Sequence, residues 1–150
     1  SYVQGRFTEP IGGTKNVPFI PATKWTSEIK AALFPKGKTM QNTTLSIEAV
    51  NQFKQNKPFT AFDTETSTGR YTLINAGIST DFYHGTTRLF SLYLLGNNLT
   101  DAAYQNHLSR LKYTSVNEAT GRTGVFNMGR NFVVKVNIPL SFTAKGRRQT

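Results

Sequence analysis

The sequence predicts an all-β protein, an antiparallel up-and-down β-meander of five to six strands. Five segments alternate apolar and polar residues, and the connections between them are alternately short and long. No apolar run reaches the length of about 18 residues that a transmembrane helix needs. A period of two places apolar side chains on one face of a strand, and a series of such strands is typical of an antiparallel sheet.

The first four strands are expected at residues 25–33, 43–54, 72–82 and 88–97. In the first three, the apolar side chains lie on one face of the strand, and Thr, Ser, Asn, Gly and a few charged residues lie on the other. In the fourth, both faces are fairly apolar, because Tyr93 and Leu95 lie opposite the apolar set. The predicted apolar face consists of Trp25, Ile29, Ala31, Leu33, Leu45, Ile47, Ala49, Phe53, Ile74, Ala76, Ile78, Phe82, Phe90, Leu92 and Leu94.

The fifth strand is expected at Arg130–Phe142, where the alternation is unbroken. Lys135 and Asn137 fall on its polar face, and Tyr2–Phe7 is a candidate tail of a sixth strand. A continuous apolar face requires an apolar medium, which is either a protein core or lipid. If the medium is lipid, the lipid-facing residues of this strand are Phe132, Val134, Val136, Ile138, Leu140 and Phe142.

The connections favour lipid. The turns at 35–41 and 83–87 are short, whereas those at 57–70 and 97–128 are long and polar. Outer-membrane barrels have short turns at one end and long loops at the other, together with aromatic girdles at both interfaces. Aromatic residues near the predicted strand ends match this pattern, and they are Phe19, Trp25, Phe34, Phe59, Phe82, Phe90, Phe132 and Phe142.

Composition gives broader bounds. The 150 residues fit one domain, and the net charge of +10 indicates an anionic neighbour. The chain has no cysteine, and His84 and His107 lie 23 positions apart without a third ligand at metal spacing. Asp63 and Glu65 have no nucleophilic or basic partner nearby in sequence. We therefore expect no enzyme activity, no metal and no cofactor.

Two segments near the end resemble a known family. Asn98, Leu99, Thr100, Asp101 and Tyr104 form an Asn-Leu-x-Asp-x-x-Tyr element, and Gly129, Arg130, Asn131 and Phe132 form a Gly-Arg-Asn-Phe element before the last strand. Both are similar to the carboxy-terminal end of TonB-dependent outer-membrane receptors, and Val17–Trp25 resembles the start of an earlier strand in that family. The resemblance covers about Val17–Phe142.

The resemblance implies a C-terminal segment of a transmembrane β-barrel in the outer membrane of a Gram-negative bacterium. Family members carry a plug domain and a barrel of about 22 strands, and this sequence contains neither the plug nor enough strands. The chain begins with Ser1 rather than Met, which we interpret as a processed or excised segment. We expect residues 1–142 to be barrel and residues 143–150 to be a disordered basic tail, which departs from the family's terminal aromatic.

The resemblance also implies function and partners. The function is energy-dependent uptake of a scarce nutrient such as a siderophore, haem, cobalamin or a glycan. The partners are the plug and remaining strands of the same receptor, the TonB complex acting through the absent plug, lipopolysaccharide, and further copies of the chain if it is made alone. No nucleic acid partner is expected, because a short basic tail beyond a strand is usually only solvated. The alternative is a soluble all-β binding module for carbohydrate or an anionic polymer.

The long loop at 97–128 supplies the candidate contact residues. It is rich in cations, with few acids, and its tyrosines could offer rigid contact area. One interpretation is a solvated loop, and the other is contact with lipopolysaccharide phosphates or an anionic ligand. The residues assigned to that contact are Tyr104, His107, Arg110, Lys112, Tyr113 and Arg122.

Overall fold

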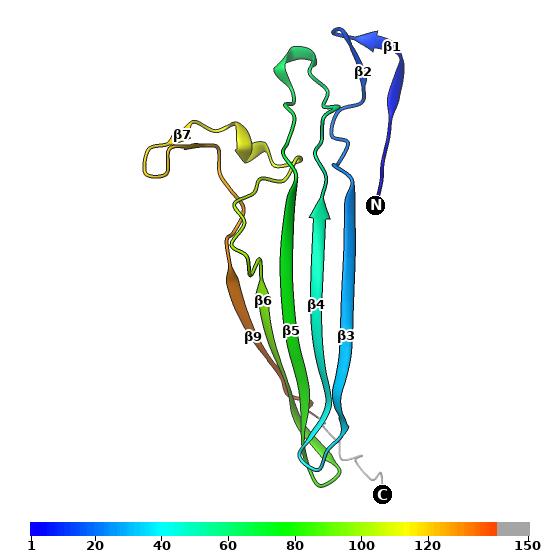
Figure 1. Ribbon diagram of the computed structural model, residues 1–150, viewed down its shortest axis with the longest axis vertical. Coiled ribbons are helices and arrows are strands. Elements are labelled where there is room, and N and C mark those ends of the chain that lie inside the picture. The colour runs from blue at the N-terminus through cyan, green and yellow to red at the C-terminus, as the bar shows by residue number, and fades with distance from the viewer. Residues whose placement is uncertain (141–150) are drawn as a thin grey trace, which may run out of the picture.

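The structure is a computed structural model, and it describes residues 1–140. One sheet of five antiparallel strands dominates it, in the order β3-β4-β5-β6-β9 (Figure 1). Because strands adjacent in sequence are adjacent in space, the predicted five-stranded meander is confirmed. The sheet is open, with β3 and β9 at its edges. The strands are β3 (Lys24–Lys36), β4 (Met40–Gln52), β5 (Tyr71–His84), β6 (Thr87–Asn97) and β9 (Asn131–Asn137).

The N-terminal segment does not add a sixth strand to this sheet. Instead β1 (Arg6–Ile11) pairs with β2 (Thr14–Asn16) as a separate hairpin. Gly12 and Gly13 turn the chain between them with φ values of 54° and 82°, a conformation that glycine adopts without steric cost. The expectation of a sixth strand is therefore not met, and only Ser1 reaches the sheet. Its backbone exchanges two hydrogen bonds with Lys24 of β3, at N···O distances of 2.5 and 3.0 Å.

The strand register confirms the predicted faces. Residues directly opposite each other share a face, and one apolar row crosses all five strands as Ala31, Leu45, Ile78, Leu94 and Val134. The next row is Ile29, Ile47, Ala76, Gly96 and Phe132. On β9, Phe132, Val134 and Val136 therefore lie on the apolar face of the sheet.

Nothing in residues 1–140 packs on this apolar face. Ile29 is 76% exposed, Phe132 74% and Val134 68%. Apart from Pro58, the buried apolar side chains of the described residues are Ala22, Phe59 and Ala61, all of which lie outside the sheet. The sheet thus forms a single layer whose hydrophobic side is uncovered (Figure 1).

The opposite face carries its own polar network. Glu28 and Glu48 face each other across β3 and β4, which would be repulsive without compensation. Lys30 forms an ion pair with Glu28 at 3.1 Å, and Asn75 donates a 2.7 Å hydrogen bond to Glu48. Further along this face, the Lys135 ammonium lies 5.5 Å from the centre of the Tyr93 ring.

The connections segregate by length (Figure 1). The β3–β4 and β5–β6 turns lie together at one end of the sheet, whereas the β4–β5 and β6–β9 connections and the β1–β2 hairpin lie at the other. This second end is called the loop end below. The loops contain two short 3₁₀ turns, η1 (Ala61–Asp63) and η2 (Arg110–Tyr113), and a small hairpin of β7 (Val116–Asn117) and β8 (Arg122–Thr123).

No helix within the described part of the chain is both long and apolar enough to cross a membrane. Two expectations fall outside residues 1–140. These are the lipid-facing position of Phe142 and the disorder of residues 143–150.

Candidate functional site

The loop end is held together by a buried polar cluster, formed by Glu65, Thr68, His107 and Lys112. Glu65 and Thr68 belong to the β4–β5 connection, and the other two belong to the β6–β9 connection. These two connections are separated by β5 and β6 in sequence, so the cluster joins segments about 40 residues apart.

Glu65 anchors the cluster to the N-terminal segment. Its side chain is buried, and its carboxylate accepts backbone N–H hydrogen bonds from Phe19 at 2.7 Å and Phe59 at 2.8 Å. Burying a carboxylate is costly unless it accepts hydrogen bonds, and a bond to a charged group contributes about 1.5–3 kcal/mol. Glu65 therefore ties the N-terminal segment to the β4–β5 connection.

Lys112 and His107 complete the cluster. The Lys112 ammonium donates to the Thr66 carbonyl at 3.1 Å and to Thr68 Oγ1 at 2.9 Å, and it lies 3.5 Å from His107 Nδ1. Thr68 Oγ1 also lies 2.9 Å from that nitrogen. An ammonium beside Nδ1 favours a neutral imidazole with its proton on Nε2.

Protonation of His107 is disfavoured at this position. Burial is the main cause that lowers the pKa of its imidazole, and the neighbouring Lys112 charge lowers it further. Glu65 acts in the opposite direction, but its carboxylate is 3.9 Å from Nε2, too far for a good hydrogen bond. Nε2 is buried and has no hydrogen-bond partner among the described residues.

Of the six candidate contact residues, two are buried and four are at least partly exposed. His107 and Lys112 are buried, and the structure uses them to connect the loops. Tyr113 is partly exposed, and its hydroxyl accepts a 3.1 Å hydrogen bond from the Thr66 N–H. Tyr104 stacks on Tyr71 with ring centres 4.4 Å apart.

Arg110 and Arg122 are the members of the set with exposed cationic side chains. The Arg110 guanidinium lies 4.8 Å from the centre of the Phe19 ring, and that of Arg122 lies 5.1 Å from the centre of the Phe126 ring. The structure therefore leaves these two available for an anion, whereas Lys112 is occupied internally.

The predicted lipid-facing residues continue past β9. Ile138 and Leu140 follow the strand and are 60% and 72% exposed. With Phe132, Val134 and Val136 they give an exposed apolar side chain at every second position from 132 to 140.

The two family-like elements meet in the structure. The Asp101 carboxylate accepts a 2.8 Å hydrogen bond from the backbone N–H of Arg130. Asn98 closes the turn before it through two 2.9 Å hydrogen bonds with the backbone of Ala102. A Cβ at Gly129 would lie 2.7 Å from Asp101 Oδ1, so a larger residue here would displace the carboxylate oxygen that accepts the Arg130 hydrogen bond. The two elements are therefore the two halves of a clasp, called the Asp101–Arg130 clasp below, at the base of the β6–β9 loop.

Sequence reasoning missed Glu65 and Thr68. Spacing along the chain suggested no partner for Glu65, because its partners come from segments far away in sequence. A polar residue in a loop carries no signal of burial, so the sequence offered no means of finding the cluster. Among residues 1–140, no three His, Cys, Asp or Glu side chains gather where they could hold a metal ion.

No family model, no curated protein and no solved structure matches this chain. The site is therefore interpreted below from its own geometry.

Proposed function

We propose that this chain is the carboxy-terminal wall of the β-barrel of a TonB-dependent outer-membrane receptor for active uptake of a scarce nutrient. The observation that carries the proposal is the uncovered apolar face. Its rows cross all five strands, and its largest side chains are exposed. A soluble protein rarely exposes an apolar surface of this extent, whereas a barrel wall presents such a face to lipid.

Strand length supports the same placement. β3, β4 and β5 contain 13, 13 and 14 residues, and a membrane-spanning strand needs about 9–11 residues. At about 3.3 Å per residue, 13 residues extend about 43 Å. The strands are thus long enough to cross the hydrocarbon at a barrel-like tilt and to emerge on both sides.

Aromatic side chains occupy both ends of the apolar face. Phe82 and Phe90 stack with ring centres 4.6 Å apart beside the β5–β6 turn, and Trp25 stands 64% exposed at the loop end. Aromatic rings at the two ends of an apolar band are typical of membrane interfaces.

The open edges imply that more of the same barrel is required. An unpaired strand edge in lipid leaves N–H and C=O groups unsatisfied, at several kcal/mol each. Ser1 already pairs with Lys24 at the β3 edge. Further barrel strands of the same receptor would pair with β3 and β9, and the energy-coupling TonB complex would act through the plug of that receptor.

In this role the chain supplies wall and outer loops and performs no chemistry. The polar face lines the lumen, the turns lie on the periplasmic side and the loop end faces outward. Arg110 and Arg122 are the residues of the predicted set best placed to meet lipopolysaccharide phosphates or an anionic ligand.

Cell fractionation of the protein that contains this chain tests the proposal. We expect recovery in the outer membrane that resists washing with high salt and carbonate, because the apolar face is embedded. Release into the soluble fraction would refute the barrel and favour a soluble all-β binding module.

A further inference from the structure

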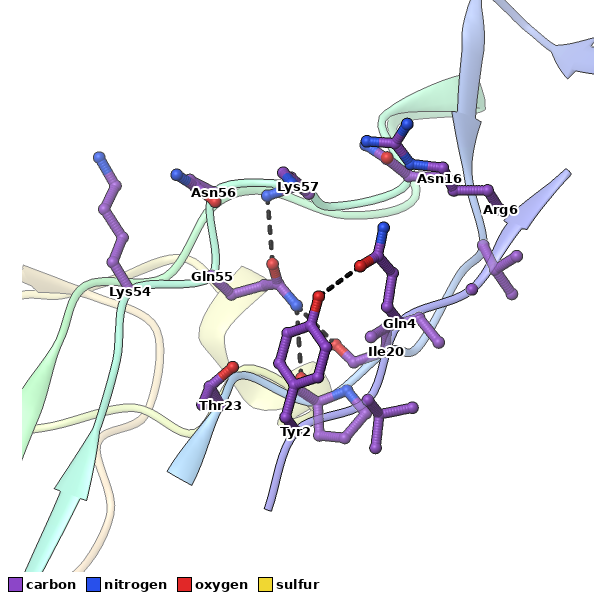
Figure 2. Close-up of a pocket in the computed structure, with 14 residues that line it drawn as sticks. Tyr2, Gln4, Arg6, Asn16, Ile20, Thr23, Lys54, Gln55, Asn56 and Lys57 are labelled. Carbon is purple, nitrogen blue, oxygen red and sulfur yellow. Dashed lines mark hydrogen bonds between the residues drawn. The ribbon is translucent and has the colours of Figure 1, made fainter. Parts of the chain in front are cut away.

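A pocket at the loop end lies between the N-terminal segment and the start of the β4–β5 connection (Figure 2). Residues 2–6 and 16–23 form one side, and residues 54–57 form the other. The pocket is separate from the cluster around Glu65 and from the arginines discussed above.

The pocket is strongly biased in charge. Arg6, Lys54 and Lys57 line it, and no Asp or Glu does. None of the three cations forms an ion pair with another residue in the range 1–140. Figure 2 shows Lys54 and Arg6 on opposite sides of the pocket, with the Tyr2 ring between them. Unpaired cations that line a concavity attract an anion more strongly than the same charges on a flat surface.

The walls of the pocket are fixed by hydrogen bonds. Gln55 Nε2 donates to the Ile20 carbonyl at 2.9 Å and to the Pro21 carbonyl at 3.4 Å. Its Oε1 accepts a 3.1 Å bond from the backbone N–H of Lys57 (Figure 2). Asn16 Nδ2 adds a 3.0 Å bond to the Pro58 carbonyl. The backbone that carries the two lysines is thus held against the opposite wall before any ligand arrives, which lowers the entropic cost of binding.

The rest of the pocket lining is apolar or polar without charge. Val17, Ile20 and Pro21 give an apolar side next to the cations. The hydroxyl of Tyr2, which donates to Gln4 Oε1, adds a polar rim (Figure 2). Cations beside an apolar wall suit an anionic group attached to a carbon skeleton better than a bare ion.

We propose that this pocket binds a phosphate monoester group. Lysine and arginine donate charge-assisted hydrogen bonds to phosphate oxygens, and the apolar side receives the carbon next to the ester oxygen. The group belongs either to a lipid headgroup at the outer surface or to a free phosphate ester. The inference does not depend on the barrel, since the pocket is formed by described residues alone.

The test removes two of the charges and compares a matched control. K54Q/K57Q removes two exposed lysines from the pocket, and K36Q/K38Q removes two exposed lysines at the opposite end of the sheet. Neither pair of side chains forms a hydrogen bond or ion pair in the described part of the chain, so both variants should fold. Glycerol 3-phosphate binding is measured by calorimetry on the full chain in detergent. Binding to phosphatidylcholine vesicles with and without phosphatidic acid is measured by flotation.

We expect K54Q/K57Q to weaken binding of at least one phosphate probe about tenfold or more, since the charge-assisted hydrogen bonds of both lysines to the phosphate are lost. K36Q/K38Q and the charge-retaining K54R/K57R should bind within about twofold of the unaltered chain. Loss confined to glycerol 3-phosphate assigns the site to a free ester, and loss confined to phosphatidic acid vesicles assigns it to a headgroup. Equal loss in K54Q/K57Q and K36Q/K38Q, or no binding of either probe by the unaltered chain, overturns the proposal. Equal loss in the two variants would attribute binding to the net charge of +10 rather than to the pocket.

Discussion

Substitution of neighbouring residues on β9 separates the two faces of the sheet. Val136 lies on the apolar face opposite Leu92, and Asn137 lies on the polar face opposite Ser91. Arginine at either position adds the same side chain at nearly the same height along the strand. The difference between the folding free-energy changes caused by V136R and by N137R therefore reports whether each face meets lipid or water.

The size of the effect follows from the position of Val136. The exposed apolar positions of this segment run from Phe132 to Leu140, and Val136 is the middle one. Eight residues at about 3.3 Å extend about 26 Å, and at a strand tilt of about 40° they span about 20 Å of the apolar band of about 25 Å in outer-membrane barrels. In the proposed barrel, V136R places a charge near the membrane midplane and should cost about 2–4 kcal/mol. N137R, in an aqueous lumen, should change stability by about 0.5 kcal/mol, as other exposed substitutions do.

The assay is equilibrium folding of the protein that contains this chain into lipid vesicles, followed through a urea titration. The unaltered protein and both variants are titrated under the same conditions, and the two free-energy changes are compared. Equal costs for V136R and N137R would mean that the apolar face of β9 does not meet lipid, and the barrel placement would be lost.

Three further outcomes are expected. The chain alone in detergent-free buffer should associate through its edges and its apolar face. Light scattering over a dilution series should then show a mass that rises with concentration. A strict monomer at high concentration would favour the soluble module. A cysteine at Ser115 should react with a membrane-impermeant thiol reagent on intact cells while one at Gly85 should not, and the reverse pattern would invert the topology. The pKa of the His107 imidazole is lowered in the folded chain from its ordinary value of 6.5. At a pH near or below 6.5 the unfolded chain therefore binds more protons than the folded chain does. The free energy of unfolding should decrease as the pH drops through 6.5. Protection factors of amides in the β6–β9 loop, in which the intrinsic pH dependence of exchange is divided out, should therefore decrease below about pH 6.5 in the unaltered chain but not in H107Q, with H84Q as the control. A decrease that survives in H107Q would assign the effect to another group.

The strands were predictable because their signal is local. Alternation in residues 72–82 and 130–142 fixes which side chains share a face, and register follows once neighbouring strands pair. The apolar row through Ile78 and Val134 is therefore largely determined by each strand's own sequence. β3, β4 and β5 extend by two or three residues past their predicted limits into the segments expected as turns, at 35–41 and 83–87. In contrast, β9 begins at Asn131 and ends at Asn137, so residues 138–140, which were expected to continue the strand, lie beyond its end.

The loop end was not predictable to the same depth. Lys112 was expected to be accessible and is buried, because Thr66 and Thr68 accept its hydrogen bonds from a different loop. The Tyr2–Phe7 segment was considered as part of a strand, but two glycines divert the chain after Ile11 into a separate hairpin. The burial of Lys112 depends on partners distant in sequence, whereas the hairpin depends on a local Gly-Gly turn. Strand periodicity carries no information about either feature.

The Asp101–Arg130 clasp has a consequence for how such a protein can diversify. It closes the β6–β9 connection at its base, so the pairing of the last two strands does not depend on the length of chain above it. The entropic cost of a longer loop grows only logarithmically, by about 0.6 kcal/mol for each doubling. Insertions at the exposed tip between β7 and β8 should thus leave the wall intact. Selection can therefore remodel the exposed tip of this loop while the sheet beneath it stays the same.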